Sequence, residues 1–190
     1  LVAPNRLQII NWQSAGAWGS KKQHQLKTEL SASNNQLNLF SDRDRGNDDG
    51  YAGKLQYAWK PQFKKGQGEV KALYQFNDAG FTTVERIYAV EFARDWNLPL
   101  NYLGALQFGS VRLAYQQDSF QLASRSELMS SPIRNGWRQA LDVNWQDSTW
   151  QGLLNLSLTQ TEGSGLQERF WRERLKQKYF WAPQAWLGLN

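Results

Sequence analysis

The segment of this chain with the clearest potential for chemistry is Asp42–Gly50, which reads DRDRGNDDG. Acidic residues at alternate positions followed by glycine are typical of calcium loops, because Ca²⁺ prefers about six to eight oxygen ligands presented by a tight turn. The glutamate that closes the full calcium-loop pattern is missing, and Arg43 and Arg45 lie among the acidic residues. We therefore expect residues 42–50 to form an exposed polar loop without a tightly held ion.

His24 is the only histidine of the chain, and no serine, aspartate or second histidine lies near it in a suitable pattern. A catalytic triad or a zinc site requires several such partners. Glycine-rich nucleotide loops, Walker sequences and nucleophile elbows are absent as well. We expect His24 to be a surface residue at the start of a strand.

Glu85, Glu91 and Asp95 are close enough in sequence to suggest acid–base chemistry on sugars. Arg86 and Arg94 lie beside them, however, and this arrangement favours structural ion pairs. The sequence therefore predicts a protein that is not an enzyme. We expect no catalytic residues, no cofactor-binding residues, no metal ligands and no cofactor.

The composition is rich in aromatic residues and yet polar overall. Aromatic residues make up 14% of the 190 residues, whereas the mean hydropathy is −0.68. Strands with one apolar face and one solvated face have this overall composition when the residues of both faces are counted together. The formal net charge of +5 could serve nucleic acid, anionic lipid or a solvated sheet face. We favour the solvated face and expect no nucleic-acid partner. The absence of cysteine excludes disulfides and thiolate chemistry.

Apolar and polar residues alternate with period two through most of the chain, which predicts β-strands. The pattern is found in Gln25–Ala32, Tyr51–Trp59, Val70–Phe76, Tyr102–Phe108, Val111–Gln117, Phe120–Leu128, Trp137–Trp145, Trp150–Thr161 and Gln167–Trp181. No run of about 18 apolar residues could form a membrane-spanning helix.

Turn-forming residues separate these segments. We expect Asn34-Asn35 to turn the chain into a return strand at Leu37–Phe40, and Gly109-Ser110 and Asp118-Ser119 to join later strands. The result is an all-β antiparallel meander of about a dozen strands. It is predicted to be a β-barrel or part of one, with a β-sandwich as the alternative.

The last predicted strand, Gln167–Trp181, separates its residue types most clearly. Trp171, Leu175, Tyr179 and Trp181 share one face of a strand, and Arg172, Arg174, Lys176 and Lys178 share the other. Charge density in Leu166–Lys178 would also suit a helix, but a helix would scatter the apolar residues over about half of its circumference, so a strand is preferred.

Tryptophan is concentrated at the ends of predicted strands. Trp59, Trp137, Trp145, Trp150 and Trp181 all occupy such positions. Aromatic rings at strand ends are typical of sheets that span a bilayer, because the rings prefer the headgroup zone. Rings that cap a soluble sheet, or that stack on sugars, would give the same placement. We favour the membrane interpretation.

The segment Val84–Leu98, VERIYAVEFARDWNL, resembles a recurring segment of large outer-membrane or cell-surface β-strand proteins of Bacteroidetes-type bacteria. The resemblance is close over these residues. The rest of the chain shares only general features with those proteins, namely alternating strands, turns rich in Gly, Asn and Asp, and many aromatic residues. The resemblance implies a Gram-negative envelope and a fragment of a larger protein. It brings no catalytic residues with it.

These observations together predict a non-enzymatic bacterial outer-membrane or surface β-protein that serves as a scaffold, a pore or an interaction surface. Its partners would be the lipid bilayer or other envelope proteins. The alternative is a soluble carbohydrate-binding β-sandwich that uses exposed Trp and Tyr. Because the chain begins at Leu1 rather than Met, we expect residues 1–190 to be a single β domain or a piece of a longer β-protein.

Overall fold

The computed structural model describes residues 6–36, 48–83, 88, 90–99, 102–163, 165–182 and 185–189. Within these ranges the chain is almost entirely β-structure, as predicted. The strands are β1 (Arg6–Trp18), β2 (His24–Gln36), β3 (Asp49–Trp59), β4 (Gln62–Phe63), β5 (Gly66–Asn77), β6 (Leu106–Gln117), β7 (Phe120–Ser130), β8 (Asn135–Gln146), β9 (Trp150–Gly163), β10 (Leu166–Ala182) and β11 (Ala185–Leu189). The helices are a 3-10 turn, η1 (Ser20–Lys22), and one short α-helix, α1 (Val90–Asp95).

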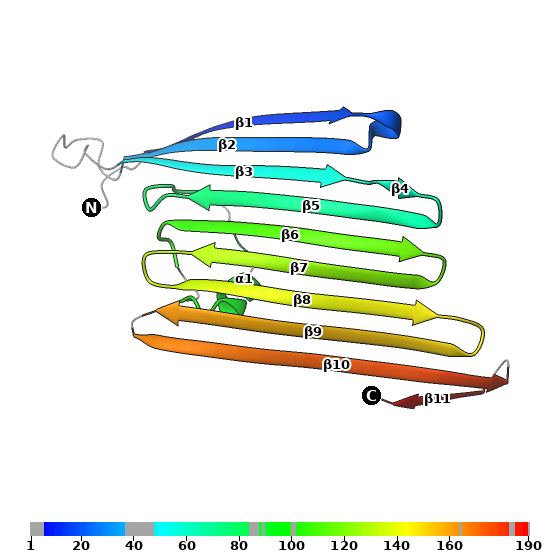
Figure 1. Ribbon diagram of the computed structural model, residues 1–190. Helices are drawn as coiled ribbons and strands as arrows, with labels where there is room; N and C mark the ends of the chain where they lie inside the picture. Colours follow the sequence, from blue (N-terminus) through cyan, green and yellow to red (C-terminus); the bar gives the residue numbers. More distant parts are fainter. Residues whose placement is uncertain are drawn as a thin grey trace.

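The strands form one antiparallel sheet in the order β1-β2-β3-β5-β6-β7-β8-β9-β10-β11, with β4 paired to β5 (Figure 1). The predicted antiparallel meander is confirmed. Among the described residues β1 does not pair with β10 or β11, so the sheet is not closed into a barrel. The β-sandwich alternative is wrong for the described chain, because each turn returns its strand beside the preceding one and all strands lie in a single sheet.

Of the three predicted turns, one is correct and two are wrong. Asp118-Ser119 joins β6 to β7, as predicted. Gly109-Ser110 instead lies inside the continuous strand β6, and Asn34-Asn35 lies inside β2, where the Asn34 amide donates to Asp49 Oδ1 across the strand pair at 2.8 Å. The predicted return strand at Leu37–Phe40 lies outside the described residues.

The register of the strand pairs assigns every strand residue to one of two sides of the sheet. Arg112 is opposite Arg125, Arg125 is opposite Ala140, and the same row continues through Ser157 to Arg172. We call this side the polar face. The other side carries Leu113 of β6 and Trp171 of β10, and we call it the apolar face.

Strand β10 bears out the interpretation of the last segment. It pairs continuously with β9 from Leu166 to Tyr179, so the helical alternative for Leu166–Lys178 is wrong. Trp171, Leu175 and Tyr179 pair with Leu158, Leu154 and Trp150 of β9, which places all three on the apolar face. The four basic residues between them lie on the polar face, as predicted from the period of a strand.

A small hydrophobic core lies on the polar face, where the connection between β5 and β6 folds back over the sheet. Trp96, Leu98, Leu106, Phe108 and Met129 are buried there, with Phe92 and Tyr88 packed against them. Figure 1 shows α1 behind the ends of β7, β8 and β9. Burial raises the pKa of Tyr88, whose hydroxyl therefore stays protonated and donates to Asn77 Oδ1 at 3.0 Å.

Candidate functional site

The apolar face is a broad surface that nothing in the described structure covers. Aliphatic side chains are frequent on it, and several of them are largely exposed: Leu113 is 53% exposed, Leu128 67% and Leu175 52%. Isolated exposed apolar residues are normal on proteins, but large contiguous patches mark surfaces that meet a partner or a lipid phase. The apolar face is therefore the first candidate for a functional surface.

Aromatic side chains line the end of this face where the short turns lie, and we call them the turn-end rim. Its members are Trp18, His24, Tyr57, Trp59, Tyr115, Phe120, Trp145, Trp150 and Tyr179. A second group, Tyr51, Tyr74, Phe76, Trp137 and Trp171, lies toward the opposite ends of the strands. Most of the aliphatic residues lie between the two groups, whereas Leu128 pairs with Trp137 of the second group. Trp12 lies at the middle of β1, outside both groups.

His24 is part of the turn-end rim and does not stand alone at the surface. Its ring stacks on Trp18 with centroids 5.5 Å apart and on Trp59 with centroids 5.9 Å apart. Its Nδ1 also shares a hydrogen bond with the Tyr57 hydroxyl at 2.8 Å. The expectation of an ordinary surface histidine is therefore refined: His24 is a half-buried polar member of an aromatic stack.

Glycine makes room for the rim where a ring lies across the neighbouring strand. A Cβ atom on Gly152 of β9 would stand 1.9 Å from Cζ2 of Trp145, which pairs with Gly152 across the strands. A Cβ on Gly53 would similarly stand 2.5 Å from the ring of its partner Phe76. Paired glycine and aromatic residues thus fix the orientation of rings on the apolar face.

Several polar side chains on the apolar face are paired with one another. The Gln139 amide accepts a hydrogen bond from Ser126 Oγ at 2.5 Å and donates one to Ser124 Oγ at 2.9 Å. Near the other end, Arg169 donates to Gln160 Oε1 at 3.2 Å. Because an unpaired polar group is costly away from water, this internal pairing suits a face that is not fully hydrated.

The polar face carries most of the charged strand residues, and many of them form ion pairs. Glu69 contacts Lys71 at 2.9 Å and Arg112 at 2.7 Å. Farther along the sheet, Arg134 contacts Glu168 at 2.9 Å. This pattern is typical of a face that meets water and whose charges also compensate each other.

Arg138 connects the sheet to α1. Its guanidinium binds Glu127 on the neighbouring strand and Asp95 at the end of the helix, the latter at 3.0 Å, and it lies 5.2 Å from the centre of the Trp96 ring. Of the carboxylates predicted to form ion pairs, Asp95 does so, with Arg138 and with Arg94 at 3.5 Å. Glu85 lies outside the described residues.

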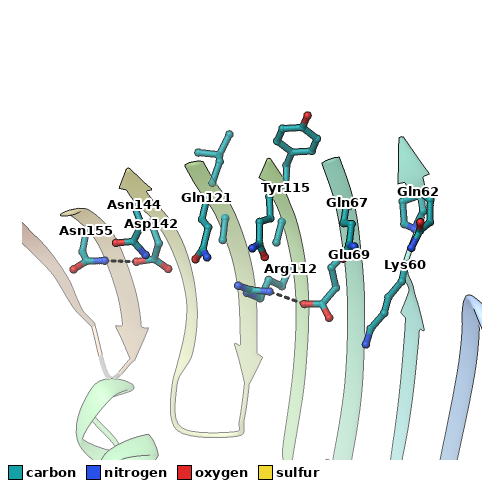
Figure 2. A pocket seen from close by; sticks show the side chains of 16 residues that line it. Lys60, Gln62, Gln67, Glu69, Arg112, Tyr115, Gln121, Asp142, Asn144 and Asn155 are labelled. Carbon is teal, nitrogen blue, oxygen red and sulfur yellow. Dashed lines mark hydrogen bonds and ion pairs between the residues drawn. The ribbon is translucent and has the colours of Figure 1, made fainter. Parts of the chain in front are cut away.

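A polar hollow of about 460 Å³ lies on the polar face between β3 and β9. Figure 2 shows its walls: the Glu69–Arg112 pair on one side, and Asp142, which accepts from Asn155 at 2.7 Å, on the other. Amide side chains of Gln67, Gln116, Gln121 and Asn144 lie in one row across four strands. The hollow contains no arrangement of nucleophile, base and acid.

Sequence reasoning located the strand-end tryptophans and the two faces of β10 correctly. It missed β1, whose alternation is weak because Ile9 and Ile10 are adjacent, and it missed α1, which has only six residues. The glycine–aromatic pairs could have been found only with the register in hand. Most of Asp42–Gly50 lies outside the described residues, and only Asp48 to Gly50 are seen, the last two in β3.

In the part of the chain that the structure describes, no three His, Asp or Glu side chains gather closely enough to hold a metal ion. No helix among these residues is long and apolar enough to cross a lipid bilayer. Comparison with protein-family models, with curated proteins and with solved structures finds no match. The contrast between the apolar face and the polar face is therefore the feature of the described structure that bears on function.

Proposed function

We propose that this chain is a non-enzymatic β-protein of a Gram-negative outer membrane or cell surface, in which the apolar face contacts lipid and the polar face contacts water. In that setting it acts as a scaffold, a pore wall or an interaction surface. The observation that carries the proposal is the order of residues on the apolar face: most aromatic rings lie toward the two strand ends, and most of the exposed aliphatic residues lie between them.

Bilayers supply the physical reason for this order. Tyr and Trp prefer the interface between headgroups and hydrocarbon, and aliphatic side chains prefer the hydrocarbon itself. Strands of the sheet contain 11 to 14 residues between β5 and β9. At about 3.3 Å per residue, such strands exceed the roughly 30 Å hydrocarbon thickness even when tilted by about 30°.

Carbohydrate binding through the exposed aromatic residues has less support. Sugar-binding rings would be expected to gather along one cleft, whereas these rings are distributed along two margins of the sheet. Several members of the turn-end rim also stack on each other, as Trp18, His24 and Trp59 do. Their faces are then less available to a sugar.

Adjacent residues of β6 offer a matched test. Leu113 lies on the apolar face and Ala114 on the polar face beside the hollow. When the denatured chain is diluted into phosphatidylcholine vesicles, Leu113→Lys should fold less completely than Ala114→Lys, because a lysine facing lipid costs about 2–4 kcal/mol near the midplane. Folding would be followed by protection of the chain from added protease.

Two results would contradict the proposal. One is a wild-type chain that stays monomeric and folded in buffer and ignores the vesicles. The other is equal loss of folding in both lysine variants, which would mean that the two faces do not differ in their surroundings.

A further inference from the structure

The excess positive charge of the chain lies on one face of the sheet. Strand residues of the polar face include ten basic residues (Lys27, Lys54, Lys71, Arg112, Arg125, Arg138, Arg172, Arg174, Lys176 and Lys178) and five acidic residues (Glu29, Glu69, Glu127, Asp142 and Glu168). On the apolar face the strands carry only Arg6 and Arg169 against Asp49, Glu162 and Glu173. The polar face is therefore electropositive.

Within the sheet, acidic residues compensate the cations that face each other. Arg112 and Arg125 are directly opposite on β6 and β7, a placement that is unfavourable for like charges. Glu69 contacts Arg112 at 2.7 Å, and Glu127 lies 3.6 Å from Arg125. The chain thus places carboxylates where neighbouring cations would otherwise repel each other.

Strand β10 is different. Arg172, Arg174 and Lys176 follow one another on the polar face, about 7 Å apart along the strand, and we call them the cationic strip. Their partners on β9 are Ser157, Asn155 and Leu153, all neutral. Within the described residues, none of the three basic side chains makes an ion pair or a hydrogen bond.

The surroundings leave the cationic strip open to a ligand. Both arginines are exposed, and the described pairing of β11 with β10 begins only at Gln177. Asn155, the neutral neighbour of Arg174, already donates to Asp142 at 2.7 Å. Nothing in the described structure therefore neutralises these charges, and a line of three cations matches an elongated anion better than a compact one.

We propose that the cationic strip binds solutes carrying several phosphate, sulfate or carboxylate groups. Guanidinium groups bind such oxyanions through paired N–H donors, and the electropositive polar face raises the local concentration of anions around the strip. The inference does not rest on the proposed lipid contact, because the strip lies on the opposite face of the sheet and can be tested without a membrane.

Isothermal titration with inorganic tripolyphosphate tests this inference on the full chain, in neutral dodecyl maltoside micelles at low ionic strength. The triple variant Arg172→Gln, Arg174→Gln, Lys176→Gln removes the strip. A matched control, Lys21→Gln, Lys22→Gln, Lys64→Gln, removes the same charge from turns outside the strand faces. The strip variant should bind at least about tenfold more weakly than wild type, and the control should stay within about twofold.

Spermine, a polycation, should give no binding heat with any of the three proteins. Circular dichroism would verify that both triple variants keep the β-sheet; if the strip variant does not fold, the single variants Arg172→Gln and Arg174→Gln replace it, and each should weaken binding measurably. The inference is overturned if wild type does not bind tripolyphosphate, or if removal of the strip and the control weaken binding equally.

Discussion

Arg138 offers a quantitative test of how the connection between β5 and β6 is held on the polar face. The side chain of Arg138 is 16% exposed and that of its partner Glu127 is 5% exposed, so their contact is shielded from water. The same guanidinium binds Asp95 at the end of α1 and lies over Trp96. We expect Arg138→Met, which keeps most of the length of the side chain, to loosen this segment.

The expected loss in the free energy of unfolding depends on the contacts that Glu127 and Asp95 keep after the substitution. Removing one partner of a buried ion pair costs about 3–5 kcal/mol, because the other charge is left uncompensated. Glu127 would keep Arg125 at 3.6 Å, and Asp95, at 23% exposed, is partly hydrated. We therefore expect the free energy of unfolding to fall by about 2–3 kcal/mol.

Denaturant unfolding in micelles, together with hydrogen exchange of residues 90–99, would measure the change. Arg125→Met is the matched control: it contacts the same Glu127, but its side chain is 46% exposed, so it should cost less than about 1 kcal/mol. Exchange should increase in residues 90–99 only for Arg138→Met. Equal destabilisation by the two substitutions would refute the argument that Arg138 fastens α1 to the sheet.

Three further outcomes are expected. Gly152→Ala should destabilise the chain by about 1–3 kcal/mol in denaturant unfolding, because the new Cβ meets an indole ring at 1.9 Å, whereas Gly109→Ala, with its nearest atom at 4.0 Å, should be tolerated. Trp171→Asp should impair assembly into vesicles far more than Arg172→Asp, and the opposite order would contradict the assignment of the faces. Backbone N–H groups at residues 149 and 150 hold the pKa of Asp147 below its usual value, so the contribution of this turn to stability is complete above about pH 4. That contribution should disappear as pH falls through the lowered pKa, which NMR shifts of the turn amides would report and Asp147→Asn should abolish.

Local alternation was sufficient to predict most of the strands, because period two is maintained wherever one face of a strand is apolar. It was sufficient for β10 in particular, where Trp171 and Arg172 must lie on opposite sides. The meander also followed from short turns such as Asp118-Ser119, since Asp tolerates the positive φ of 47° found there.

Other features depended on pairing partners that the sequence does not reveal. Gly109 does not adopt a positive φ, and nothing lies closer to its Cβ position than 4.0 Å, so it continues the strand instead of turning it. Asn34 likewise serves as a cross-strand partner of Asp49. The contact of Arg138 with Asp95 joins residues 43 positions apart, which no local pattern can predict.

The central claim is that the two faces of the sheet lie in different surroundings, and the lack of cysteine allows a direct measurement of it. Val143 and Asn144 are adjacent on β8, on the apolar and the polar face respectively. Each would be replaced singly by cysteine, labelled with a fluorophore and refolded into phosphatidylcholine vesicles with lipid-borne or water-soluble quenchers. The claim predicts that the label at Val143→Cys is quenched mainly from the lipid and the label at Asn144→Cys mainly from water. Equal quenching of both labels by the water-soluble quencher, with none from the lipid, would contradict it.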